Sequence, residues 1–272
     1  MSFVPIDEDN RTTHTKSGQC ALLGRQYGIL RVLTTICMSY LVFDIETIGK
    51  PYDEFDETSK EIFHEWAQRD AKSEGEVELE LEKIKLGLPL SPFLGEIVAV
   101  SVLDHEGKGG TYFQAPGSKL KDFEDGDLQY RVSSEKEILE RFWDIARHYT
   151  TFVTFNGRGF DVPYLMIRAA AHGIRPSRDL MSNRYLGMQR GATHIDLSDQ
   201  LTFYGAMYPR PKLHFAAKAF GIESSKDGDI DGKEVPQAFA DKRYEEIARY
   251  CMADVVVTKK LYEHWRDYLY LA

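Results

Sequence analysis

Most hydrophobic positions of this chain fall either in short apolar runs or in segments where apolar residues recur every three or four positions. The runs have the length of buried β-strands, and the segments have the period of amphipathic helices. Their order predicts an α/β fold, a mixed sheet with helices on both faces. The predicted strands lie at 41–45, 96–103, 111–114, 151–155 and 195–197, and the main predicted helices at 134–148, 161–172, 213–220 and from 244 to the C-terminus.

Several of these elements have recognisable ends. Ser134 and Glu137 have the spacing of a capping box, which indicates a helix start. Gly173 and Gly221 follow the last apolar positions of two predicted helices, where glycine commonly ends a helix. A glycine-rich turn at 107–110 would join the second and third strands into a hairpin.

An acidic insertion at 52–95 follows the first strand. Residues 52–85 include 12 acidic and five basic residues. Phe63 and Trp66 fit a helical period, so we expect amphipathic helices with a solvated outer face.

The first 37 residues are polar and aperiodic, and Met38 stands just before the first strand. We therefore expect 1–37 to be a tail outside the core and 38–272 to be the folded domain. The alternative is an extra packed element at 27–36.

The composition is that of an ordinary globular protein, with 272 residues, 43% hydrophobic and 28% charged. The three scattered cysteines argue against a disulfide scaffold or a cysteine zinc site and indicate a reducing compartment. No apolar stretch reaches the ~20 residues of a membrane span, and acids at 7–9 stand where a targeting peptide would be basic. We expect a soluble, cytoplasmic protein with no membrane partner.

Charge is unevenly distributed. The net charge is −9, yet residues 168–218 hold eight basic and three acidic residues. Because screening limits the reach of each charge to about 8–10 Å, a local basic face can still attract a polyanion.

Asp44 and Glu46 are two apart in an apolar strand, so their side chains leave the same face. Neighbouring carboxylates repel unless a cation lies between them. A hard divalent ion such as Mg²⁺ or Mn²⁺ would explain the pair. The alternative is two acids at a strand end facing water.

Two further groups are suggestive but unspecific alone. Asn156 and Asp161 bracket a glycine-containing turn from strand to helix, and each also suits a purely structural role in a turn or helix start. Tyr250 and Asp254 are four apart, hence on one helical face. Alone, they also fit an amphipathic helix with a tyrosine at its edge.

Taken together, the three groups resemble the exonuclease motifs of the DEDD 3′–5′ exonucleases, in their tyrosine-containing branch. Arg249 stands where the sister branch has a histidine, which supports this branch. From Met38 onward the chain is similar to a bacterial family of predicted 3′–5′ exonucleases related to the proofreading domain of family-B DNA polymerases. The similar segments are LVFDIETIG, VTFNGRGFDVPYLMIRA, HIDLSDQLTFYGA, KLHFAAKAFGI and YCMADVVVTKKLY.

The resemblance implies an RNase H-like fold with a five-stranded mixed sheet, and a two-metal nuclease acting on 3′ ends of single-stranded nucleic acid, with DNA favoured. Asp44, Glu46, Asp161 and Asp254 would hold two Mg²⁺ or Mn²⁺ ions about 3.5–4 Å apart. Tyr250 would orient the attacking water. A role in proofreading or DNA repair would require a polymerase or repair partner in trans, because the chain ends just after the last motif.

Other positions are weaker candidates, each with a core or solvated-surface role as the alternative. His194, Asp196 and Asp199 are expected to be structural. Contacts to the terminal nucleotide or to backbone phosphates would come from Thr47, Asn156, Phe160, Arg158, Lys212 and His214.

Three other functions are alternatives for this sequence. A catalytically silent nucleic-acid-binding or scaffold module of the same fold is disfavoured because all four acids are present. An RNA-processing exonuclease would differ only in contacts to the 2′-hydroxyl. A glycosidase with paired carboxylates would leave the Tyr-x3-Asp motif unexplained.

Overall fold

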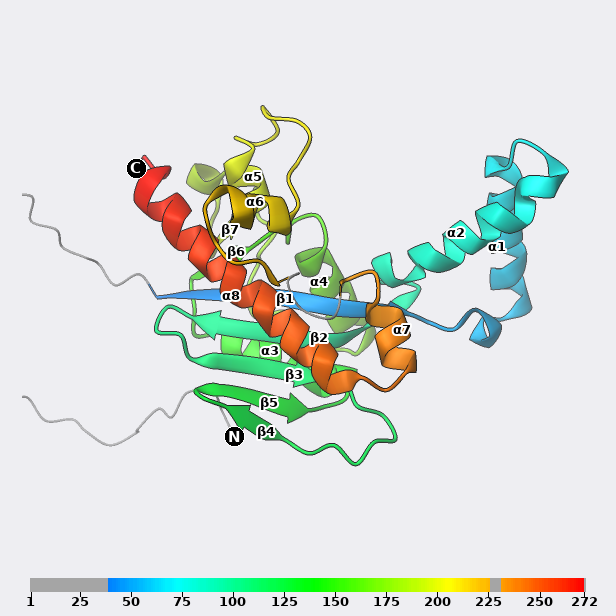
Figure 1. Cartoon of the computed structure of the whole chain (residues 1–272), viewed down its shortest axis with the longest axis horizontal. Coiled ribbons are helices and arrows are strands. Elements are labelled where there is room, and N and C mark those ends of the chain that lie inside the picture. Colours follow the sequence, from blue (N-terminus) through cyan, green and yellow to red (C-terminus); the bar gives the residue numbers. More distant parts are fainter. Residues whose placement is uncertain (1–38, 226–230, 272) are drawn as a thin grey trace, which may run out of the picture. The chain divides into compact units, whose positions relative to one another are not determined.

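The computed structural model describes residues 39–225 and 231–271. Its centre is a seven-stranded mixed sheet of order β4-β5-β3-β2-β1-β6-β7 (Figure 1). β1 is antiparallel to β2 on one side and parallel to β6 on the other. The strands are β1 Tyr40–Gly49, β2 Gly95–Asp104, β3 Gly109–Phe113, β4 Phe123–Asp125, β5 Leu128–Val132, β6 Thr151–Thr154 and β7 Thr193–Asp196.

The five predicted strands are present, but the expected total of five is wrong, because β4 and β5 extend the sheet. β4 has only three residues, two of them acidic, and in β5 apolar and polar residues alternate. Neither strand therefore stands out as an apolar run. Gly126 and Asp127 form the two-residue loop between them, and a Gly-Asp pair in such a loop is a hairpin signal.

The turn predicted at 107–110 is also too long, because β3 already begins at Gly109. A Cβ on Gly109 would lie 2.0 Å from the Val102 carbonyl oxygen. Glycine at this position therefore serves close strand pairing rather than the turn.

Helices cover both faces of the sheet (Figure 1). α8 packs on β1, β2 and β3, while α3 packs on β2 and β3 from the other side. Two short helices, α5 and α7, were not predicted, and Leu197, expected in the last strand, begins α5 instead. The helices are α1 Glu57–Asp70, α2 Val77–Gly87, α3 Glu135–Ala146, α4 Asp161–Ala171, α5 Leu197–Leu201, α6 Leu213–Ala219, α7 Val235–Ala240 and α8 Tyr244–Tyr268.

The acidic insertion forms the pair α1–α2, as expected, with its own small core around Phe63 and Leu81. Its return segment is tied to β1 just beyond the Asp44 and Glu46 pair. Thr47 Oγ1 donates to the Pro89 carbonyl at 2.7 Å, and the Lys50 amide donates to the Leu94 carbonyl at 2.9 Å.

A buried carboxylate joins α3 and α4 to β2. Glu135, which is 5% exposed, accepts hydrogen bonds from the Ile97 amide and from the Arg168 guanidinium. His172 Nε2 lies 2.7 Å from its Oε2. The predicted capping box is confirmed, since Ser134 and Glu137 make both reciprocal bonds.

The expected tail at 1–37, the alternative element at 27–36 and the boundary at Met38 lie outside the described residues. No helix among the residues that the structure describes is long and apolar enough to cross a membrane.

Candidate active site

Asp44 and Glu46 lie on the face of β1 that α8 covers. They pair across the sheet with Ser101 and Ala99, and an irregularity follows between Glu46 and Thr47. Phe43 points to the opposite face, where it is fully buried and its ring centroid lies 5.1 Å from that of Phe142. The alternation of a half-buried strand therefore delivers both carboxylates to one side, as the sequence predicted.

Asp161 reaches the same strand from the start of α4. Its Oδ1 accepts a hydrogen bond from the Ile45 amide at 3.2 Å. Asn156, in the preceding turn, has φ 66°, a left-handed conformation that asparagine tolerates. A Cβ on Gly157 would lie 2.3 Å from Thr154 Oγ1, so this turn requires glycine.

Asp196 supports this turn from the end of β7. Its carboxylate accepts the amides of Asn156 at 2.8 Å and Arg158 at 2.9 Å, and it also caps α5 by accepting from the Ser198 amide. These three bonds give Asp196 a structural role.

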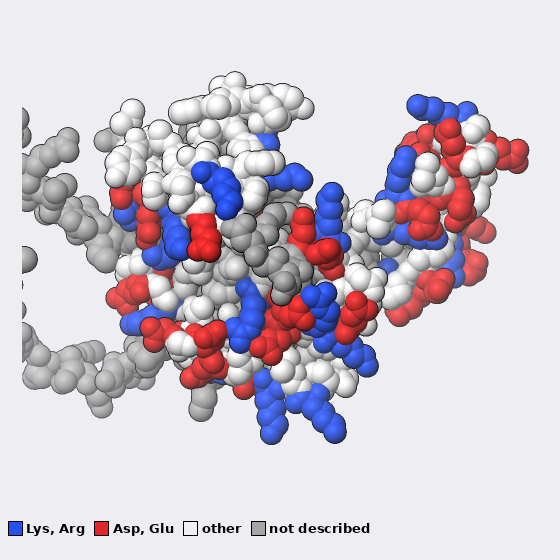
Figure 2. Space-filling model, viewed as in Figure 1, with Lys and Arg blue, Asp and Glu red and all other residues white. Residues whose placement is uncertain are grey.

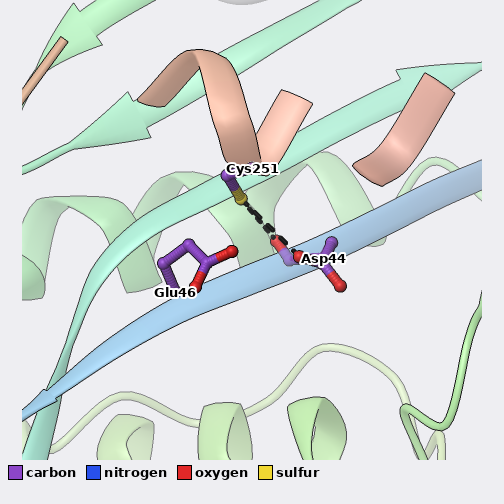
Figure 3. A group of neighbouring side chains, drawn as sticks. All are labelled: Asp44, Glu46 and Cys251. Atoms are coloured by element: carbon purple, nitrogen blue, oxygen red, sulfur yellow. Dashed lines mark hydrogen bonds between the residues drawn. The ribbon is translucent and has the colours of Figure 1, made fainter. Parts of the chain in front are cut away.

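α8 brings a thiol to the carboxylate pair. Cys251 Sγ lies 3.5 Å from the Asp44 carbonyl oxygen and 3.9 Å from its Oδ2 (Figure 3). Asp44, Glu46 and Cys251 each offer one ligand atom, and these atoms lie within 4.8 Å of one another. Cys251 has no role among the residues predicted from the sequence. Its place inside the Tyr-x3-Asp motif, on a helix that must face the acids, is the signal that would have found it.

The carboxyl groups around β1 repel one another. Burial, and then the charges of Asp161, Asp254 and Glu46, raise the pKa of Asp44 well above its usual value. Burial raises the pKa of Asp161 to about 7, and the charges of Asp196 and Asp254 add to this. All four predicted metal carboxylates thus act electrostatically on one small region, although Asp161 and Asp254 lie outside the group of three ligand atoms.

Tyr250 faces the same region. Burial, and then the charges of Asp254, Glu46 and Asp44, raise the pKa of its hydroxyl well above the usual value. The hydroxyl is therefore protonated at neutral pH, so Tyr250 is suited to hold a water by hydrogen bonding rather than to act as a free base. A Cβ on Gly232 would lie 3.6 Å from this hydroxyl, so the chain passes close to it.

The predicted substrate contacts differ in their surroundings. Thr47 is buried and bonded to Pro89, whereas the Phe160 ring is half-buried against Tyr164. The Arg158 guanidinium donates to the carbonyls of Leu180 and Met181, so it makes structural hydrogen bonds within the protein.

The remaining candidates lie at or near α6. Lys212 is exposed just before the helix, and His214 Nδ1 lies 2.8 Å from Ser224 Oγ. His194 is a satisfied core histidine, as expected. Its Nδ1 donates to the Leu180 carbonyl and its Nε2 accepts from Thr154, while burial lowers its pKa to about 4.

The donor set fits hard divalent cations. The charges that act on Asp44 are those of other carboxylates, so a cation between them would relieve the repulsion. Carboxylate oxygens are the ligands that Mg²⁺ and Mn²⁺ prefer.

Comparison with known proteins identifies relatives. A family described as predicted 3′–5′ exonucleases related to the exonuclease domain of PolB matches residues 91–268, about two thirds of the chain. The matched range contains Asp161, Tyr250 and Asp254, and β1 precedes it.

Among curated proteins, the DNA polymerase of Pyrococcus glycovorans is 28% identical over 183 residues, covering 61% of this chain and 22% of the polymerase. DNA polymerase 1 of Pyrococcus abyssi is 29% identical over 188 residues, covering 60% of this chain and 24% of the polymerase. This chain therefore spans about a quarter or less of the length of these relatives.

The fold is shared with a solved structure, the family B DNA polymerase from the hyperthermophilic archaeon Pyrobaculum calidifontis. The TM-score is 0.54 at 19% sequence identity, covering 84% of this chain and 24% of that one. This likeness confirms the expected RNase H-like fold class. The family match confirms the expected enzyme class, and the chain belongs to the family of predicted 3′–5′ exonucleases related to the exonuclease domain of family-B DNA polymerases.

Proposed function

We propose that this protein is a metal-dependent exonuclease that hydrolyses single-stranded DNA from its 3′ end. The observation that carries the proposal is the gathering of mutually repelling carboxyl groups on one face of β1, under α8 and beside the start of α4. A polyanionic substrate would not approach such a cluster unaided. Bound cations would turn it into a site for phosphate.

Asp44, Glu46, Asp161 and Asp254 would hold the cations, with Mg²⁺ or Mn²⁺ as the ions. When bound, two such ions stabilise the charge on the attacking and leaving oxygens of an in-line phosphodiester hydrolysis. The number and identity of the ions belong to the proposal.

The protein's own residues would position the reactants. The Tyr250 hydroxyl, protonated at neutral pH, would orient the attacking water. The turn at 156–160, held by Asp196, would place Asn156 and Phe160 beside the terminal nucleotide, the first by hydrogen bonding and the second by stacking. Thr47, next to Glu46 and fixed to Pro89, would contact the scissile end.

A product ladder tests this proposal. Purified protein with Mg²⁺ or Mn²⁺ is given matched single-stranded DNA and RNA labelled at the 5′ end, and a DNA strand blocked at its 3′ end as the control. We expect DNA to shorten one nucleotide at a time and the blocked strand to persist. If RNA is degraded in preference to DNA, RNA takes the place of DNA as the substrate. If no strand is cleaved, the proposal is refuted.

A further inference from the structure

The surface formed by residues 180–222 differs from the rest of the protein in charge. The chain has 43 acidic residues, yet this segment contains only Asp196 and Asp199. These are 3% and 4% exposed, so neither presents its charge to solvent. Figure 2 shows the region over α5 and α6 as largely white, without the red side chains that are frequent elsewhere.

Large aromatic side chains project from this segment, in which both acidic side chains are buried. Tyr185 is 51% exposed, Phe203 60%, Tyr208 94% and Phe215 63%. Arg184 and Arg210 lie among them. We call these six residues the aromatic–basic surface. All four come from one stretch of the chain, and exposed apolar patches usually mark an interaction site.

Contacts between its segments hold this surface in place. Arg184 donates two hydrogen bonds to Asp199, at 2.9 and 2.6 Å, and Arg210 lies 3.6 Å from the same carboxylate. One buried carboxylate therefore faces two guanidinium groups, which leaves an excess of positive charge. The rings of Tyr185 and Tyr204 pack with centroids 4.8 Å apart, and this contact joins the residues around Tyr185 to the turn after α5.

The aromatic–basic surface adjoins the candidate active site. Asp196 caps α5, from which the surface extends, and the same carboxylate holds the Asn156 and Arg158 amides of the turn before Asp161. The charge of Asp196 also acts on Asp161. A strand whose 3′ end lay at Asp161 would therefore have this surface within a few nucleotides.

We propose that the aromatic–basic surface binds the unpaired nucleotides upstream of the scissile bond. Exposed aromatic rings stack on bases of any sequence, and guanidinium groups contact phosphates, which is the combination that single-stranded nucleic acid requires. In a duplex the base faces are already stacked, so a single strand is the ligand that this chemistry fits. The inference rests on the proposed function, because it assigns a path to the same substrate.

Substrates of two lengths distinguish binding at this surface from binding at the catalytic centre alone. Tyr208→Ala, Phe215→Ala and Arg210→Ala are compared with wild type on oligothymidylates about four and about 16 nucleotides long, near the range of site sizes of single-strand binding folds. Two substitutions serve as matched controls. Tyr268→Ala removes an aromatic side chain that is 76% exposed at the end of α8, and Lys136→Ala removes a positive charge on α3. KM and kcat are measured with Mg²⁺, and binding is measured by fluorescence anisotropy in EDTA.

We expect each aromatic variant to raise KM for the longer strand about fivefold or more, the lower limit for one stacked base, with kcat and the short substrate unaffected. Arg210→Ala should reduce the slope of log affinity against log salt by about 0.7, the value for one phosphate contact to a single strand.

An unchanged KM for the longer strand, or an equal loss on both lengths, would overturn the inference. If the wild-type protein binds the longer strand through these residues but cleaves neither substrate, the proposed function is refuted and the proposed binding surface is retained.

Discussion

The amide of Ile45 donates to Asp161 Oδ1 at 3.2 Å, and this bond joins the middle of β1 to the first residue of α4. Ile45 lies between Asp44 and Glu46, so the bond fixes Asp161 beside both. An acid at the start of a helix is common for local reasons. Here its partner is 116 residues away, which gives the side chain a tertiary role.

Replacing Asp161 by Asn keeps the acceptor oxygen for Ile45 and removes the charge. We expect turnover to fall by about 10²-fold or more, since even outer partners of metal ligands contribute 10–100-fold. Thermal stability in EDTA should stay equal or rise, because a repelled buried charge is lost. Differential scanning fluorimetry beside a cleavage assay measures both, and a large drop in the melting temperature would show that the charge itself stabilises the fold.

Replacing Tyr250 by Phe removes one hydroxyl and keeps the ring. If the hydroxyl orients the attacking water, kcat should fall by about 10²–10⁴-fold, the range for a positioned proton-transfer group. Mn²⁺ affinity should not change, whereas Asp254→Asn should weaken it. Steady-state kinetics with a metal titration separates the two roles, and wild-type turnover in Tyr250→Phe would reduce the tyrosine to a packing residue.

Cys251→Ser tests whether the thiol beside Asp44 is a ligand. Burial raises the pKa of this thiol, and Mg²⁺ prefers oxygen, so turnover with Mg²⁺ should be little affected. Cd²⁺ prefers sulfur, so wild type should bind it at Asp44, Glu46 and Cys251 with a sulfur-to-metal absorption band. The variant should lose that band and bind Cd²⁺ at least about tenfold more weakly. Equal Cd²⁺ binding by both proteins would exclude the thiol as a ligand.

Gly157→Ala places a Cβ 2.3 Å from Thr154 Oγ1 and should displace the turn that precedes Asp161. The expected cost is about 1–3 kcal/mol of unfolding free energy, typical of overpacking. Gly187→Ala is the control, because a Cβ there meets nothing within 4 Å. Urea unfolding of both variants decides the matter, and equal stability would mean that the turn can move.

Glu135→Gln should destabilise the protein at neutral pH by about 3 kcal/mol, because it leaves the Arg168 guanidinium without its buried carboxylate. Burial alone would raise the Glu135 pKa, but the bonds from Arg168, Ile97 and His172 outweigh it and hold the pKa below its usual value. A carboxyl group whose pKa is lowered by folding stabilises the protein at pH values above its unfolded-state pKa of about 4.3. This stability is lost as the pH falls through the folded-state pKa. The difference between wild type and variant should be constant above about pH 5 and shrink in more acidic buffer. A difference that stays constant there would refute this assignment.

The elements that sequence predicted are those whose pattern is local. Strand alternation put Asp44 and Glu46 on one face, and the capping box marked the start of α3. β4 and β5 were missed because a short, polar edge pair is stabilised by its neighbours in the sheet, above all β3.

The surroundings of other site residues depend on long-range contacts that the sequence does not reveal. Cys251 was inside a recognised motif, but its 3.5 Å approach to the Asp44 carbonyl depends on how α8 crosses β1. Arg158 has the charge of a phosphate ligand, yet the carbonyls of Leu180 and Met181 occupy it. Such contacts join residues far apart in the chain, where no periodic pattern reports them.

The central claim, that the carboxylates of β1, α4 and α8 form a metal centre at a 3′ end, is tested most directly by a crystal structure with Mn²⁺ and a short single-stranded DNA whose 3′-terminal linkage cannot be hydrolysed. We predict two anomalous peaks about 3.5–4 Å apart, bounded by Asp44, Glu46, Asp161 and Asp254, with the terminal phosphodiester between them. A 3′ end bound elsewhere, or manganese absent from these carboxylates, would contradict the account.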